Sequence, residues 1–90
     1  MKKQIDAVRK FHEVYKIPCK DSPTTDISKN LLSLRYRLMS EENEEYLEAA
    51  ENGDLIEVAD ALGDMLYILC GTIITHGMQH KIEEVFDEIQ

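Results

Sequence analysis

The apolar positions of the N-terminal half recur at helical spacing and predict two helices separated by a loop. The first helix, over about residues 2–16, carries an apolar side chain every three or four positions: Ile5, Val8, Phe11 and Tyr15. The two prolines and the Asp, Ser and Thr residues of IPCKDSPTTD then predict a loop. The second helix begins near Asp26 or Ser28 and ends at Asn52 and Gly53, because such a pair is a typical C-terminal stop.

The C-terminal half predicts two more helices, one of which is apolar on all sides. The third helix begins at Asp54, which forms a capping-box pattern with Glu57, and it continues to Gly77. It has no charged residue from Met65 to Thr75, so we expect it to be buried at the centre of a bundle. The fourth helix has one apolar stripe, formed by Ile82, Val85, Phe86 and Ile89. The pattern therefore predicts an all-α fold of four helices in a single domain, residues 1–90.

The composition of the chain limits which partners it can bind and in which cellular compartment we expect it. With 18 acidic and 10 basic residues the net charge is −8, so we expect the chain to bind neither a nucleic acid polymer nor an anionic membrane surface. The N-terminus lacks the apolar segment of a signal peptide, and the uncharged stretch from Met65 to Thr75 is too short to span a bilayer. The two cysteines lack metal-ligand spacing. These features favour a cytoplasmic protein with free thiols, whose small core makes self-association expected.

Much of the negative charge lies in the run SEENEEYLEAAENGDLIEVADALGD, and part of it faces the apolar side of the second helix. At about 100° per residue, Glu42 and Glu45 fall inside the arc that the apolar side chains occupy. Glu41 lies at its edge, and Glu44 and Glu48 lie outside it. Two of the five glutamates are therefore expected to point inward.

On the third helix the acidic residues and a buried surface share one stripe, formed by Glu57, Asp60, Asp64, Tyr67, Ile68 and Gly71. Burying ionised carboxylates without partners costs on the order of several kcal/mol each. The facing stripe offers only Arg35 and Arg37 as cations. Mg²⁺ or Mn²⁺ would compensate the charge, because these ions prefer oxygen ligands and retain positions for a phosphate. On the pattern alone, a non-catalytic helical interaction protein with a solvated acidic face is the alternative.

The segment LRYRLMSEENEEYLEAAENGDLIEVADALGDMLYILCGTIITHGM resembles the MazG-like all-α nucleoside triphosphate pyrophosphohydrolases, and most closely their small phosphoribosyl-ATP pyrophosphohydrolase-like members. The resemblance implies a four-helix MazG-like bundle completed by dimerisation, as a homodimer or a dimer of dimers. It also implies Mg²⁺-dependent hydrolysis, with Mn²⁺ as a possible substitute, of the α–β phosphate bond of a (d)NTP or related nucleotide to a monophosphate and pyrophosphate. The phosphoribosyl-ATP pyrophosphohydrolase of histidine biosynthesis is a further alternative.

The family signature assigns roles to the first group of acids. It reads Glu-Glu-x-x-Glu on one helix, which Glu41, Glu42 and Glu45 match residue by residue. The resemblance therefore places Glu42 and Glu45 in the metal site. It suggests Glu41 as the catalytic base that orients the attacking water, or as a further ligand.

The second half of the signature, Glu-x-x-Asp, matches less closely. Asp64 precedes the apolar run as the family aspartate does, but Ala61 stands where the glutamate is expected. We expect Asp60 and Asp64 to complete the metal site, with Glu57 in reserve.

Two further side chains are candidates for substrate binding. Arg35 lies about two turns before Glu42 on the same face and could meet the outer phosphates, or pair with a neighbouring glutamate. Tyr67 could stack on a base, or belong to the core.

Overall fold

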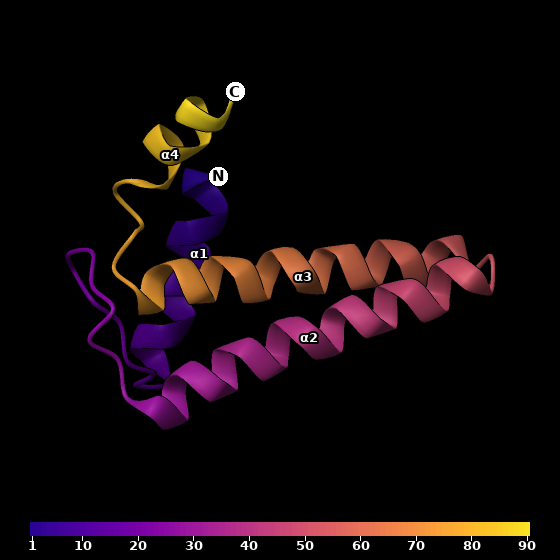
Figure 1. Ribbon diagram of the computed structural model, residues 1–90, viewed down its shortest axis with the longest axis horizontal. Helices are drawn as coiled ribbons and strands as arrows, with labels where there is room; N and C mark the ends of the chain where they lie inside the picture. Colours follow the sequence, from indigo (N-terminus) through magenta and orange to yellow (C-terminus); the bar gives the residue numbers. More distant parts are fainter. The chain divides into compact units, whose positions relative to one another are not determined.

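The computed structural model describes all residues 1–90 and contains four α-helices and no strands (Figure 1). The helices are α1 (Lys2–Val14), α2 (Lys29–Glu51), α3 (Leu55–Thr75) and α4 (Ile82–Ile89). The prediction of an all-α fold with four helices is therefore confirmed. Helix α1 ends before the predicted residue 16, because Lys16 has a left-handed backbone with φ 55° that cannot continue the helix.

Local hydrogen bonds explain where α2 and α3 begin and why a short turn joins them. The Ser28 hydroxyl oxygen accepts a 3.2 Å hydrogen bond from the backbone N–H of Leu31 and so caps α2. Helix α2 stops just before Gly53, whose φ of 67° few other residues adopt. Asp54 then caps α3, because its Oδ1 accepts a 3.1 Å bond from the N–H of Glu57. As a result α2 and α3 run antiparallel as a helical hairpin (Figure 1).

The chain divides into two compact units. The first unit consists of Met1–Ile27 and Cys70–Gln90, and the second consists of Ser28–Leu69. The second unit is the helical hairpin, formed by α2 and most of α3. Helix α3 is continuous through both units and contributes its last turns to the first.

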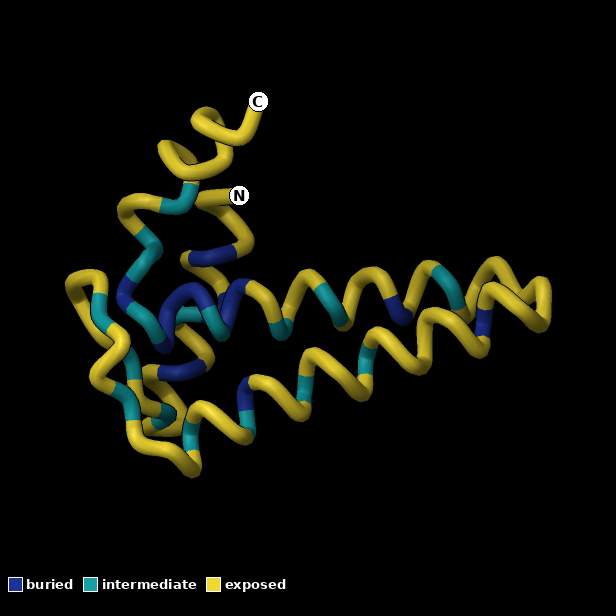
Figure 2. Tube along the Cα trace, viewed as in Figure 1, coloured by how far each residue is buried: buried dark blue, intermediate teal, exposed yellow.

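The first unit contains a small apolar core, seen as dark segments in Figure 2. Its buried members are Ile5, Val8, Cys70, Ile73 and Ile74. The loop after α1 is attached to the end of α3 by backbone bonds from Lys20 N–H to the Ile74 carbonyl, 3.2 Å, and from Thr24 N–H to the His76 carbonyl, 3.0 Å. This unit therefore combines apolar burial with a fixed loop.

The helical hairpin buries far less. Only Arg35, Ala49 and Ala61 are buried in it, and large apolar side chains such as Leu62, Leu66 and Leu69 are exposed. The expectation that the uncharged half of α3 is buried throughout therefore holds only for its last turns, where every residue from Cys70 to Thr75 except the half-buried Thr72 is buried. The reason is geometric, since in the hairpin α3 has a single neighbouring helix, which covers one of its sides.

By length and mean hydropathy, 1.5, α3 could cross a membrane. A single helix of this kind is weak support for a membrane segment, because the core helix of a soluble protein has the same properties.

Two glycines with the same backbone conformation give a matched test of loop packing. Gly53 and Gly77 both have φ 67°, but a Cβ atom at Gly53 would meet nothing within 4 Å, whereas at Gly77 it would overlap the backbone of Ser22. We expect Gly53→Ala to lower the free energy of unfolding by about 1–2 kcal/mol, the cost of a left-handed alanine. Gly77→Ala should lose clearly more in urea denaturation. Equal losses would show that the loop does not pack on Gly77.

Candidate metal centre

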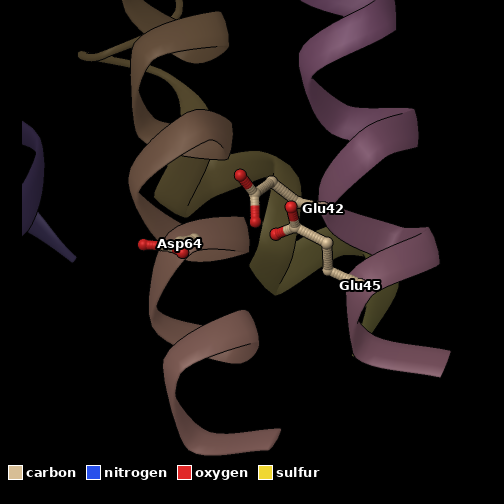
Figure 3. Close-up of side chains that lie close together, drawn as sticks. All are labelled: Glu42, Glu45 and Asp64. Atoms are coloured by element: carbon tan, nitrogen blue, oxygen red, sulfur yellow. The ribbon is translucent and has the colours of Figure 1, made fainter. Parts of the chain in front are cut away.

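Three carboxylates from the two helices of the hairpin meet at one point, where Glu42 is half-buried while Glu45 and Asp64 are exposed. Glu42 and Glu45 extend from α2 and Asp64 lies on α3 (Figure 3), and one oxygen of each lies within 4.8 Å of the others. Their position follows from sequence spacing, because Arg35, Glu42 and Ala49 recur at seven-residue intervals and so occupy the side of α2 that faces α3. The cluster therefore occupies positions that apolar residues fill in an ordinary helical hairpin.

Glu42 is the most enclosed of the three acids. It is half-buried, and its Oε2 atom is buried without a hydrogen-bond partner. Burial raises the pKa of Glu42, and the neighbouring carboxylates of Glu45, Asp64 and Glu41 raise it further. The folded chain therefore places negative charge where its own side chains do not compensate it.

A divalent cation fits this donor set. The candidate ligands are all carboxylate oxygens, which Mg²⁺ and Mn²⁺ prefer, and they come from two neighbouring helices. Oxygens bound to one octahedral Mg²⁺ ion lie about 2.0–2.1 Å from it, so opposite ligands are about 4.1 Å apart and adjacent ligands about 2.9 Å. Small side-chain movements from the present separation of up to 4.8 Å would satisfy this geometry.

A cleft of about 360 Å³ adjoins the cluster on the side of the hairpin turn. Its lining is strongly acidic and includes Glu45, Glu48, Glu57, Asp60 and Asp64, while the small side chains of Ala49 and Ala61 leave the space open. The structure therefore brings Asp64 to the two glutamates and leaves Asp60 and Glu57 in the cleft, outside the three-residue cluster.

Sequence reasoning missed Glu48, which was expected to point away from the site but lines the cleft. The available signal was its spacing, because Glu48 lies about one turn after Glu45 and about one turn before Asn52, which also lines the cleft.

The remaining predicted site residues have different environments. Glu41 is exposed and its Oε1 lies 3.7 Å from Nε of Arg37, so it lies beside the cluster on the solvent side. Tyr67 is 42% exposed. Arg35 is buried at 7% exposure, and its Nη2 donates a 2.9 Å hydrogen bond to the backbone carbonyl of Ile68.

In this all-α chain, two adjacent helices bring carboxylates to one point. Such an arrangement is typical of carboxylate-based metal sites. A model of the phosphoribosyl-ATP pyrophosphohydrolase family matches residues 8–90, and the chain belongs to this family. It is thus a MazG-like nucleotide pyrophosphohydrolase, a hydrolase that acts on acid anhydrides, rather than a non-catalytic interaction protein. Enzymes of this family generally depend on divalent metals. No curated protein and no solved structure matched the chain.

The raised pKa of Glu42 predicts how the stability of the metal-free protein depends on pH. The ordinary pKa is 4.5, so between that value and the higher pKa of the folded state the folded chain holds more protons than the unfolded chain. Raising the pH through this window should therefore destabilise the wild type relative to Glu42→Gln. Urea denaturation in chelator across pH 4.5 to 7 measures the difference. Glu44→Gln removes an exposed carboxylate outside the cluster and should keep the wild-type slope, whereas parallel profiles for all three proteins would contradict the prediction.

Proposed function

We propose that this chain is a Mg²⁺-dependent nucleotide pyrophosphohydrolase that also accepts Mn²⁺. It cleaves the α–β phosphate bond of a (d)NTP or related nucleotide and releases a monophosphate and pyrophosphate. The observation that carries the proposal is the buried, unpartnered Oε2 of Glu42 within a cluster of three carboxylates. The family to which the chain belongs makes phosphoribosyl-ATP the second candidate substrate.

The metal ligands in this proposal are Glu42, Glu45 and Asp64, with Asp60 and then Glu57 as the nearest additional carboxylates along the cleft. A bound divalent cation would neutralise the negative charge that builds on the phosphate oxygens. The acidic lining of the cleft makes this essential, because a nucleotide without a cation would be repelled from it.

Glu41 is the proposed catalytic base. It neighbours Glu42 in the sequence, and its ion pair with Arg37 joins two exposed side chains, so little free energy is lost when it reorients. In the reaction, the oxygen of a water molecule bonds to a phosphorus of the anhydride while the bond from that phosphorus to the bridging oxygen breaks. Glu41 orients the water and accepts its proton.

Tyr67 is the proposed contact for the nucleotide base. It follows Asp64 by about one turn of α3, and its ring is accessible. An exposed aromatic ring beside a phosphate site can stack on a base of any identity, so this contact would supply affinity with little base selectivity. We place the enzyme in the cytoplasm, in keeping with a family of soluble enzymes.

Substitution of the glutamates tests the proposed activity. Pyrophosphate release from a panel of nucleotides and phosphoribosyl-ATP is measured with Mg²⁺ or Mn²⁺. Glu45→Gln should lower kcat/KM by about 100-fold or more, because it removes a ligand. Glu44→Gln is the matched control on the outer side of α2 and should change it by less than about threefold, since solvent screens its charge. Release of pyrophosphate from no substrate, or equal effects of the two substitutions, would count against the proposal.

We also propose that the enzyme is a homodimer or a dimer of dimers. Leu55, Leu62, Leu66 and Leu69 recur on one stripe of α3 beside the side that faces α2, and all four are exposed in the single chain. The hairpin buries only three of its own residues, so we propose that a second copy of the chain buries this stripe.

Sedimentation velocity tests the assembly. At micromolar concentration the wild type should sediment as a dimer or larger species. Leu66→Glu should shift it towards the monomer, because a charge in an apolar interface remains unpaired. A wild type that sediments as a folded monomer would overturn this part of the proposal.

A further inference from the structure

Arg35 is the one charged side chain buried in the helical hairpin. Its guanidinium does not extend to solvent, where it could meet a phosphate directly. Its Nη2 instead donates a 2.9 Å hydrogen bond across the hairpin to the backbone carbonyl of Ile68. Burial lowers the pKa of Arg35, while the nearby Tyr67 raises it. The charged guanidinium therefore occupies a position where desolvation costs free energy.

The bond links two points at fixed distances from the carboxylate cluster. On α2, Arg35 precedes Glu42 by seven residues, which is about 10.5 Å along the helix. On α3, Ile68 follows Asp64 by four residues, which is about 6 Å. The acceptor is a backbone carbonyl, whose position is set by the helix itself and not by a side-chain rotamer. The bond therefore sets the axial position of the α3 backbone relative to Arg35 on α2.

The other buried and half-buried residues of the hairpin determine the axial register of α2 and α3 less strictly. The half-buried Leu34 and Leu38 and the buried Ala49 and Ala61 are apolar, and apolar contacts lack the directionality of a hydrogen bond. A slip of one residue moves the carboxylates by about 1.5 Å, and Mg²⁺ requires its ligands at about 2.0–2.1 Å. In paired helices a single buried polar residue commonly fixes the register at some cost in stability.

We propose that Arg35 is a positioning residue, whose bond to the Ile68 carbonyl holds α2 and α3 in the register that brings Glu42 and Glu45 to Asp64. This inference rests on the metal site of the proposed function. It differs from a direct role of Arg35 in binding the substrate phosphates, because it predicts an effect on metal affinity before any nucleotide is present.

The sign of the effect separates positioning from general electrostatics. Removal of a positive charge near a cation site should by Coulomb's law strengthen cation binding. If Arg35 fixes the register, Arg35→Met should weaken it, because the ligands no longer converge. Residues that orient metal ligands typically change affinity by about 10- to 100-fold when they are replaced.

The experiment measures Mn²⁺ binding to the substrate-free full chain by electron paramagnetic resonance, together with kcat and KM. Arg35→Met keeps most of the apolar stem, and such replacements of buried charges often preserve stability. We expect its Kd for Mn²⁺ to rise by about tenfold or more, with kcat lowered. Arg35→Lys retains a donor and a charge and should stay within about threefold of the wild type. The control is Arg37→Met, at an exposed arginine on the same helix, and it should bind Mn²⁺ at least as tightly as the wild type.

Each outcome has a separate meaning. Unchanged or tighter Mn²⁺ binding by Arg35→Met would overturn the positioning role while leaving the metal site intact. A raised KM with unchanged Mn²⁺ affinity would assign Arg35 to the phosphates instead. A wild type that does not bind Mn²⁺ would refute the proposed metal site, and this inference with it. If Arg35→Met does not fold by circular dichroism, Arg35→Gln, whose amide is too short to reach the Ile68 carbonyl, serves in its place with the same expectation.

Discussion

The approach of the Glu42, Glu45 and Asp64 carboxylates to one point is the interaction on which the proposed metal site of the helical hairpin depends. Burial raises the pKa of the Glu42 carboxyl, and the neighbouring carboxylates of Glu45 and Asp64 raise it further. In the proposed metal site, a divalent cation bound by these carboxylates would compensate their charge.

The surrounding residues serve this arrangement in different ways. Ala49 and Ala61 open the cleft on one side of the cluster, and the bond from Arg35 to Ile68 crosses the hairpin on the other. Helix α3 is continuous, and its C-terminal residues Cys70, Ile73 and Ile74 are buried in the core of the first unit. One helix therefore carries both the proposed ligand Asp64 and apolar core residues of the first unit.

The sequence predicted much of this arrangement because helical periodicity and capping are local. The turn at Gly53 and the inward direction of Glu42 follow from spacing along one helix. The choice between Asp60 and Asp64 did not follow, since both lie on one stripe of α3 and only the axial position of α2 distinguishes them. The same limit hid Glu48, which lines the cleft together with Asp60 and Ala61 of α3. The exposure of the N-terminal half of α3 was not predicted for another reason. An apolar sequence indicates a surface that favours burial, but it does not show whether the same chain buries it.

The stability of the folded chain as a function of Mg²⁺ concentration tests the account most directly. A ligand that binds only the folded state raises the free energy of unfolding by about 2.7 kcal/mol at a hundredfold excess over Kd. We predict that urea denaturation at pH 7 shows this rise for the wild type, with Mg²⁺ and with Mn²⁺, and no comparable rise for Glu45→Gln. A wild-type stability that is independent of both ions, or an equal rise in the variant, would contradict the metal centre.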